Sequence, residues 1–194
     1  MKVLVTGGAG YIGSHTSLAL PRHGYEGIVV DNFSNSSLIA LERVQQLAGR
    51  KLRIFETDLC DHSGLQSVFQ ENPEIESVIH FAALKAVGES TIEPLRYYQN
   101  NVGGSIALLR EMQNAGVHNL VFSSSCTVYG EPETVPLLES HPIGSVSSPY
   151  GRTKYMMEGI IQDHCKANPS WNAAILRYFN PVGADKSGVI GKDP

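Results

Sequence analysis

The stretch VLVTGGAGYIGSH, residues 3–15 of the 194-residue chain, decides how this protein folds. An apolar run leads into Gly7, Gly10 and Gly13, and helix-forming residues follow the last of these glycines. Glycine permits a tight turn and a close backbone approach to a pyrophosphate, and the helix N-terminus offers free N–H groups to the anion. Because these glycines lie between a strand pattern and a helix pattern, we predict a dinucleotide-binding turn.

A carboxylate stands at the end of the next apolar run, which covers residues 27–30. Asp31 comes 18 residues after Gly13, where an acidic side chain accepts hydrogen bonds from both hydroxyls of an adenosine ribose. The same carboxylate repels a 2′-phosphate, so the sequence favours NAD over NADP. The alternative is a structural turn followed by a solvated aspartate.

Short apolar runs alternate with helical patterns along most of the chain. The runs lie at residues 3–5, 27–30, 52–55, 78–81, 120–122 and 173–176, and the helical patterns at 12–20, 38–47, 64–69, 94–114 and 150–166. Apolar runs without polar alternation are typical of strands buried on both faces. We therefore predict an α/β fold of the Rossmann type, a doubly wound parallel sheet with helices on both faces. The proline-rich residues 131–149 are expected to form a long loop.

Composition excludes several classes of protein. The chain is 42% hydrophobic and 18% charged, which excludes a disordered protein, and its net charge of −4 argues against a nucleic-acid-binding surface. Cys60, Cys126 and Cys165 are widely spaced and odd in number, so neither a disulfide framework nor a metal site is expected. No apolar run is long enough to suggest a membrane span. Reduced thiols and an N-terminus without signal-peptide features predict a cytoplasmic enzyme.

Strand ends supply further candidates, since open α/β sheets bind ligands where their strands end. Asp58 and Leu59 follow the third apolar run and are placed to contact adenine. Phe81, Ala82 and Ala83 end the fourth run, where small side chains let a nicotinamide ribose approach. Each of these residues is also common at an ordinary strand end, so the support for a cofactor site comes from their occurrence on successive strands.

A phenol and an ammonium group stand four residues apart at Tyr150 and Lys154, which places them on one helix face. A free tyrosine titrates near 10, and lowering that pKa to about 7 requires roughly 4 kcal/mol of differential stabilisation. Lys154 and a positively charged nicotinamide ring could together supply it. Ser125, at the end of the fifth run, can orient a substrate oxygen or pass a proton to Tyr150. Helix-surface residues and a strand-to-turn serine are the alternatives, but the combination predicts proton transfer.

Several segments carry a resemblance to a known family. They are TGGAGYIGSH at residues 6–15, DN at 31–32, FAALKAVGES at 81–90, SSSCTVYG at 123–130, SPYGRTK at 148–154 and LRYFNPVGA at 176–184. With these motifs the chain resembles the UDP-hexose 4-epimerases of the extended short-chain dehydrogenase/reductase family. The resemblance implies a tightly held NAD and a homodimer. It further implies reversible inversion at the sugar C4 through a 4-keto intermediate, which interconverts UDP-glucose and UDP-galactose in galactose metabolism.

The resemblance also implies roles for individual residues. The adenosine half of the cofactor would be held by Tyr11, Ile12, Asp31, Asn32, Asn35 and Ser36, with Asp58 and Leu59 at the adenine. The rest of the NAD site would be lined by Phe81, Ala82, Lys85, Asn100, Ser125, Tyr150, Lys154 and Phe179. The catalytic group would be Ser125, Tyr150 and Lys154, and substrate contacts would come from Lys85, Ser125, Tyr150, Tyr178 and Asn180.

The domain division follows from the same comparison with the family pattern. Residues 1–177 are expected to form the NAD-binding domain with the catalytic residues, and residues 178–194 to begin a substrate-binding region that is largely absent from this chain. The chain is thus expected to be the N-terminal part of such an epimerase. Two alternatives stay open at this point: another NAD-dependent nucleotide-sugar epimerase of the same superfamily, and a non-catalytic NAD-binding module.

Overall fold

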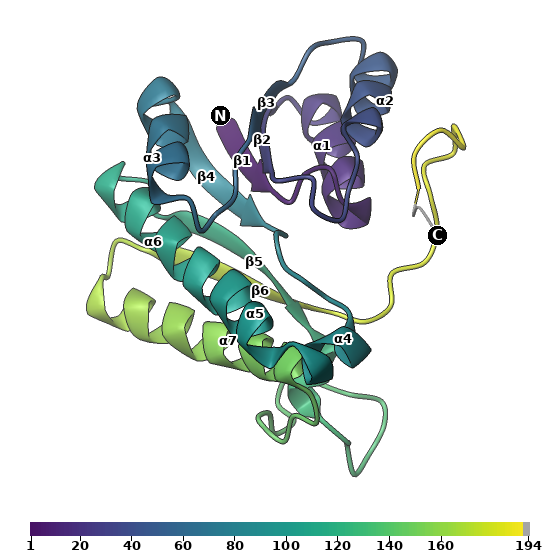
Figure 1. Ribbon diagram of the computed structural model, residues 1–194, viewed down its shortest axis with the longest axis vertical. Coiled ribbons are helices and arrows are strands. Elements are labelled where there is room, and N and C mark those ends of the chain that lie inside the picture. Colours follow the sequence, from purple (N-terminus) through teal and green to yellow (C-terminus); the bar gives the residue numbers. More distant parts are fainter. Residues whose placement is uncertain (192–194) are drawn as a thin grey trace.

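The computed structural model describes residues 1–191, and its centre is one parallel sheet of six strands (Figure 1). The strands are β1 (Lys2–Thr6), β2 (Glu26–Asp31), β3 (Arg53–Glu56), β4 (Ile75–His80), β5 (Asn119–Ser125) and β6 (Asn172–Tyr178). They lie in the order β3-β2-β1-β4-β5-β6, and every neighbouring pair is parallel. This is the strand order of a Rossmann fold, so the predicted fold class is confirmed.

Helices cover both faces of this sheet. They are α1 (Tyr11–Arg22), α2 (Leu38–Ala48), α3 (His62–Glu71), α4 (Val87–Ile92), α5 (Pro94–Tyr97), α6 (Gly104–Asn114) and α7 (Pro149–Ala167), with a π-helix η1 (Tyr98–Gly103) and a 3₁₀-helix η2 (Cys126–Tyr129). α1 and α2 lie on one face, and α3, α6 and α7 lie on the other (Figure 1). Side chains alternate accordingly along β1, because Leu4 packs in the cluster with α3 and α6 whereas Val3 and Val5 pack with Leu20 of α1.

The segment predicted as one helix over residues 94–114 is interrupted in the structure. α5 passes into the π-helix η1, and α6 begins only at Gly104. Within η1, the side chain of Asn101 bonds the backbone of Leu84, which lies outside the helix. Turns of π-helix are uncommon and concentrate at functional sites. Helix α4 was not predicted, because six residues are too few to show helical periodicity.

Helix α7 carries Tyr150 and Lys154 and begins where the sequence supplies start signals. Ser148 Oγ accepts a hydrogen bond from Gly151 N at 3.1 Å and so caps the helix. Pro149 occupies the first helical position, where its missing N–H leaves no bond unmade. Residues 130–148 contain neither helix nor strand, so the predicted loop is present, but its last proline belongs to α7.

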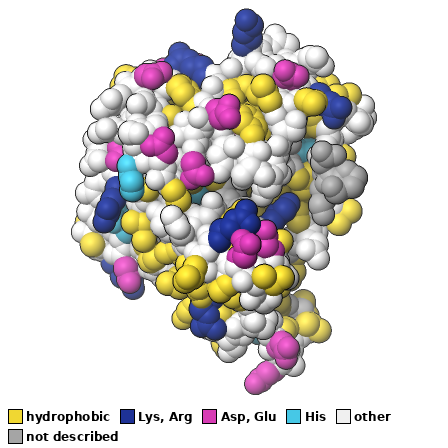
Figure 2. All heavy atoms as spheres, in the orientation of Figure 1, with side chains coloured by type: hydrophobic (Ala, Val, Ile, Leu, Met, Phe, Trp, Pro, Cys, Tyr) yellow, Lys and Arg dark blue, Asp and Glu magenta, His cyan; other side chains and the backbone are white. Residues whose placement is uncertain are grey.

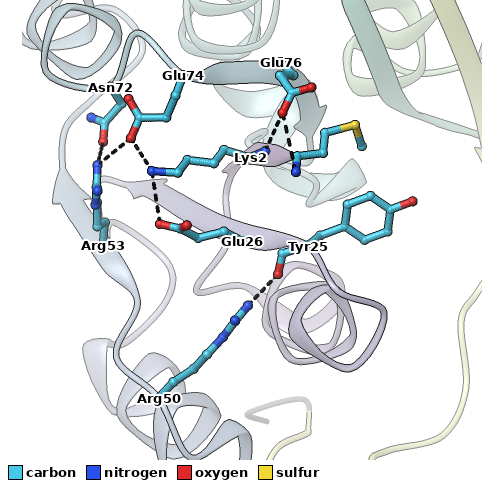
Figure 3. Close-up of polar contacts among 9 residues, drawn as sticks. Lys2, Tyr25, Glu26, Arg50, Arg53, Asn72, Glu74 and Glu76 are labelled. Atoms are coloured by element: carbon cyan, nitrogen blue, oxygen red, sulfur yellow. Dashed lines mark hydrogen bonds and ion pairs between the residues drawn. The ribbon is translucent and has the colours of Figure 1, made fainter.

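A cluster of charged side chains lies where the strands begin, as Figure 3 shows. Lys2 at the start of β1 pairs with Glu74 and, at 3.5 Å, with Glu26. Arg53 of β3 lies 3.1 Å from the same Glu74 carboxylate and donates to Asn72 Oδ1 at 2.6 Å. These groups are partly solvent-exposed, so each pair adds little to stability. The cluster lies at the opposite edge of the sheet from the strand ends described below.

The segment that follows β6 returns toward α1 and α2 (Figure 1). Ile190 is buried in the cluster formed by Leu18 of α1 and Leu41 of α2. Asp185 lies 3.1 Å from Arg22, and its N–H donates to His15 Nε2 at 3.1 Å. Within residues 1–191, no helix is long and apolar enough to cross a membrane. In the same range, no three His, Cys, Asp or Glu side chains are grouped to hold a metal ion.

Candidate active site

The carboxyl ends of the six strands bring most of the predicted site residues to one edge of the sheet. Because all strands are parallel, the glycine turn, Asp31, Asp58, Phe81, Ser125 and Tyr178 lie at or just beyond the same edge. Open α/β sheets bind ligands at this edge, beside the point where the strand order reverses. Here that point lies between β1 and β4.

The glycine turn between β1 and α1 tolerates no side chain at two of its positions. Gly7 has a φ of +70°, and a Cβ there would lie 2.6 Å from the backbone N of Ala82. A Cβ at Gly13 would lie 2.1 Å from Gly7 O. A Cβ at Gly10, in contrast, would meet nothing closer than Gly7 O at 3.4 Å. Gly7 and Gly13 therefore shape the turn itself, while Gly10 leaves a surface that a phosphate can approach.

This contrast predicts different outcomes for two alanine substitutions. Gly13→Ala should destabilise the protein by about 1–3 kcal/mol or more, because the new methyl group overlaps the backbone of the turn. Gly10→Ala should leave the thermal midpoint within a few degrees of wild type but reduce the amount of bound dinucleotide. Thermal unfolding and the nucleotide content of the purified proteins measure both effects. Equal midpoints for the two variants would contradict this account of the turn.

Asp31 is buried and already accepts three hydrogen bonds from the protein. Its Oδ2 accepts from Ala9 N at 2.9 Å, and its Oδ1 accepts from Phe33 N at 3.0 Å and from Ser36 Oγ at 2.8 Å. A carboxylate offers about four acceptor positions. The sequence interpretation assigned both ribose hydroxyls to Asp31, and in this arrangement the second hydroxyl must take the place of Ser36.

Two further residues assigned to the adenosine half meet across the ends of β2 and β3. Asn32 Nδ2 donates to Asp58 Oδ2 at 2.7 Å, and Asp58 Oδ1 accepts from Cys60 N at 2.8 Å. Leu59 is buried and belongs to the core cluster with α6. This network holds the Asp58 carboxylate in place beside the end of β2.

Lys154 is buried beneath the site, with 4% of its surface exposed. Its ammonium donates to Ser123 O at 2.7 Å and lies 4.9 Å from the centre of the Phe122 ring. Burial lowers the pKa of Lys154 to about 8. Lys154 is therefore still mostly positively charged at pH 7, but it loses its proton at a lower pH than an exposed lysine does.

Ser125 and Tyr150 form the other part of the catalytic group. Ser125 Oγ lies at the junction of β5 and η2 and accepts from Thr127 N at 3.3 Å. Burial raises the pKa of Tyr150, and the Ser125 hydroxyl partly offsets this by lowering it. The sequence interpretation expected Lys154 and a bound nicotinamide ring to lower this pKa together. In the protein alone burial prevails, so the lowering has to come from groups that bind there.

Sequence reasoning missed Asn101, a buried residue that joins three parts of the site. Its Oδ1 accepts from Leu84 N at 2.8 Å and from Asn100 Nδ2 at 2.9 Å, and its Nδ2 donates to Leu84 O at 2.9 Å. The same Nδ2 donates to Thr153 Oγ1 at 3.1 Å, and Thr153 Oγ1 donates to Tyr150 O at 2.7 Å. The signal available in the sequence was an Asn-Asn pair followed by Gly-Gly inside a helical pattern.

His80 is a second buried polar residue that the sequence did not single out. Its Nδ1 lies 2.7 Å from Thr6 Oγ1, and its Nε2 lies 2.8 Å from Ser105 Oγ. Burial, and to a lesser degree the charge of Lys154, lower the pKa of His80 to about 3. The ring therefore stays neutral and bridges β1, β4 and α6 as a structural element.

Most of the remaining assigned residues have few polar contacts with one another. Lys85, Asn35, Phe179 and Asn180 are exposed, and within residues 1–191 no hydrogen bond joins their side chains to another assigned residue. Tyr178 is partly buried, and burial raises its pKa. The Tyr11 hydroxyl donates to Gly183 O, and Phe81 N and Ala82 N both donate to Thr6 O, at 2.9 and 3.1 Å.

Comparison with known protein families gives one match over nearly the whole chain. Residues 3–192 match the family described as the NAD dependent epimerase/dehydratase family. Among curated proteins, the UDP-glucose 4-epimerase of Haemophilus influenzae is 55% identical over 194 residues, and that of Bacillus subtilis is 56% identical. Both alignments cover 100% of this chain but 57% of the relative. The chain thus spans little more than half the length of these relatives.

Solved structures give the same result. The UDP-glucose 4-epimerase of Bifidobacterium longum, determined in complex with NAD⁺ and UDP, is 48% identical and superposes with a TM-score of 0.98. The match covers 100% of this chain and 58% of that one. The enzyme from Stenotrophomonas maltophila, with bound NAD and formylated UDP-arabinopyranose, is 45% identical with a TM-score of 0.96, covering 100% and 57%.

Proposed function

Because this chain belongs to the NAD dependent epimerase/dehydratase family, we propose that it is the cofactor-binding and proton-transferring part of a UDP-glucose 4-epimerase. Such an enzyme interconverts UDP-glucose and UDP-galactose by inversion at the sugar C4 and serves galactose metabolism. The observation that carries the proposal is the buried Lys154 one turn after Tyr150, with Ser125 beside the phenol. A module that only binds a nucleotide has no use for a buried ammonium at this place.

The site fits NAD on three counts that can be read from the protein itself. The first turn of α1 has no side-chain cap, so its N–H groups are free for the pyrophosphate. Gly10 lies open beside them, as described above. The Asp31 carboxylate would repel a 2′-phosphate at the adenosine ribose. When bound, NAD supplies a hydride acceptor and donor for the C4 carbon.

The residues of the chain supply the proton chemistry. Tyr150, once ionised, accepts the proton of the 4′-hydroxyl and later returns it to the keto oxygen. Ser125 orients that oxygen and donates to it as negative charge develops. Lys154 holds a buried positive charge one turn further along α7, and with NAD bound this charge would favour the ionised phenol. Since each cycle returns both the proton and the hydride to the sugar, the reaction inverts C4 without net oxidation of the sugar.

The direct test is turnover of UDP-galactose by the native protein that contains this chain. Proton NMR should show UDP-galactose converting to UDP-glucose with no net change in NAD. Turnover of a UDP-uronate in place of UDP-galactose would favour the other nucleotide-sugar epimerases. Tight NAD binding with no turnover of either would favour a non-catalytic binding module.

We propose that residues 1–177 form the NAD-binding unit and that residues 178–194 begin the substrate-binding region. Tyr178 ends β6, and the next residues leave the sheet. Within the second segment, residues 192–194 lie outside the described residues. The proposal is supported by Tyr178, the last residue of β6, which pairs with Ser125 of β5, and by Asn180, which comes two residues later.

We propose that the protein forms a homodimer through helices α4, α5 and α7. Val87, Ile92, Leu95 and Met156, on α4, α5 and α7, are exposed apolar side chains, and both Ile92 and Leu95 are 81% exposed. Figure 2 shows hydrophobic side chains gathered on the lower half of this face, the half where α4, α5 and α7 lie in Figure 1. Light scattering of the native protein should give twice the monomer mass, and a monomer at micromolar concentration would contradict the proposal.

We propose that the enzyme acts in the cytoplasm. Cys60, Cys126 and Cys165 are all free thiols, which is compatible with a reducing compartment. NAD and UDP-sugars as reactants agree with that location.

A further inference from the structure

A buried ion pair lies next to the catalytic group and has no part in the chemistry proposed above. Glu158 stands one turn after Lys154 on α7, with 1% of its surface exposed. Arg177 of β6 donates to it in a bidentate manner, from Nη2 to Oε2 at 2.8 Å and from Nε to Oε1 at 3.0 Å. Arg177 immediately precedes Tyr178, so the pair joins the helix of Tyr150 to the strand that leads to the substrate side.

Two more contacts extend the pair to the other side of the site. Ser124 Oγ donates to Glu158 Oε1 at 2.5 Å, which ties the carboxylate to β5 directly before Ser125. Arg177 Nη1 donates to Tyr129 OH at 2.9 Å, and the guanidinium lies 4.9 Å from the centre of the Tyr129 ring. Tyr129 ends the 3₁₀-helix η2, which begins directly after Ser125.

Stability alone gives little reason for an ion pair at this place. Desolvation of two charges offsets most of their attraction, and apolar side chains of similar volume are often as stabilising. A bidentate guanidinium–carboxylate contact does something that apolar packing does not, because it fixes two elements in one relative orientation. Here the contact joins α7, which carries Tyr150 and Lys154, to β6, and the bond from Ser124 joins the same carboxylate to β5, which ends at Ser125.

We propose that Glu158 and Arg177 are positioning residues, which hold Tyr150 and Lys154 on α7 in register with Ser125 on β5. The inference rests on the proposed function, because it assigns the pair to the same proton transfer. Neither residue touches the reacting atoms; each acts through the elements that it joins. Displacing α7 against β5 by a fraction of a turn would separate the phenol from the serine without unfolding the domain.

The test replaces both charges at once. Arg177→Met alone should lower the thermal midpoint strongly, because it leaves the buried Glu158 carboxylate unpaired, and Glu158→Met should lower it less, because the Arg177 side chain is 17% exposed. The double variant Glu158→Met/Arg177→Met removes both charges and should regain most of the midpoint. Its kcat for UDP-galactose should nevertheless stay roughly 10- to 100-fold below wild type, with KM changed little, because the loss is one of alignment.

The pKa of Lys154 gives a second measurement that does not depend on turnover. A pH titration followed by NMR of ¹³Cε-labelled lysine measures this pKa, which in wild type is about 8 because the ammonium is buried. The lowered pKa of Lys154 comes from burial and not from the charges of Glu158 and Arg177, so removing both charges should not by itself move it. In the double variant it should return toward the ordinary value of about 10.4, as the loosened side chain regains water.

The matched control is the partly exposed pair at the other edge of the sheet, Arg53 and Glu74 (Figure 3). Arg53→Met/Glu74→Met should leave kcat and the pKa of Lys154 as in wild type. Should the Glu158/Arg177 double variant not fold, Arg177→Lys replaces it, because lysine keeps the charge but not the bidentate contact. That single variant should also lose roughly 10-fold in kcat while remaining folded.

The outcomes separate this inference from the function on which it rests. If wild type does not convert UDP-galactose, the proposed function is wrong. If wild type converts it and the double variant, or Arg177→Lys in its place, keeps the wild-type kcat and Lys154 pKa, the pair is merely structural and the inference is overturned. A kcat loss of the same size in the Arg53/Glu74 control would also overturn it.

Discussion

Tyr150→Phe should reduce kcat for UDP-galactose by roughly a thousandfold, the scale on which a positioned acid–base group acts. Phenylalanine keeps the ring and its packing but removes the only atom that can accept the 4′-hydroxyl proton. The Gly turn and Asp31 are untouched, so the variant should still purify with NAD. Single-turnover kinetics with UDP-galactose measures the loss.

The control for this substitution lies five residues further along the same helix. Tyr155 is 38% exposed and has no place in the proposed chemistry, so Tyr155→Phe should leave kcat unchanged. Near-normal turnover in Tyr150→Phe would remove the assigned base. A comparable loss in both variants would mean that α7 is sensitive to any tyrosine replacement rather than to this hydroxyl.

Lys154→Met should separate activity from stability. Turnover should fall roughly a hundred- to a thousandfold, because a fixed charge next to the reacting group is lost. The effect on the free energy of unfolding should instead depend on pH. Burial depresses the pKa of Lys154 to about 8, so the folded state carries a penalty of about 3 kcal/mol for the ammonium below that pH.

The sign of the pH dependence follows from proton binding. Between pH 8 and about 10.4 the unfolded chain keeps this proton while the folded protein has released it, so the contribution of Lys154 to stability rises with pH. The penalty is complete below pH 8 and has gone near pH 10.4. Urea unfolding should therefore show the stability of Lys154→Met, relative to wild type, falling by about 3 kcal/mol from pH 7 to pH 10.

A lysine on the solvent side of α7 provides the comparison. Lys166 has a side chain 76% exposed and pairs with Asp163 at 3.5 Å. Lys166→Met should change neither turnover nor the pH dependence of unfolding beyond the measurement error. A pH-independent difference between Lys154→Met and wild type would show that the ammonium is not held at a depressed pKa.

The sequence was sufficient for the parts of the molecule that depend on local pattern. Apolar runs predicted all six strands, and glycine spacing predicted the turn, because strand burial and backbone crowding act within a few neighbouring residues. The position of Asp31 followed from the same reasoning. The hydrogen bond that it accepts from Ala9 N did not, since Ala9 follows a different strand, 22 residues earlier.

The interactions that brace the site depend on partners far apart in the chain. Asn101 reaches Leu84 across 17 residues and Thr153 across 52, and Glu158 reaches Ser124 across 34. No local window contains both members of such a pair, so an asparagine or a glutamate on a predicted helix is indistinguishable from a surface residue. The direction of the Tyr150 pKa shift was inaccessible for the same reason, because burial is a property of the assembled fold.

The segment after β6 contacts both the strand that carries Tyr178 and the helix that follows the glycine turn. It begins beside Tyr178, bonds Tyr11 through Gly183 O, and seats Ile190 between α1 and α2, the helices next to the glycine turn. If the proposed function holds, a UDP-sugar that contacts this segment would also act on the helix that begins at the glycine turn. Linkage is reciprocal, so any factor by which a UDP-sugar tightened NAD binding would equal the factor by which NAD tightened binding of the UDP-sugar. Retention of the cofactor and capture of the substrate would then be two measurements of one equilibrium.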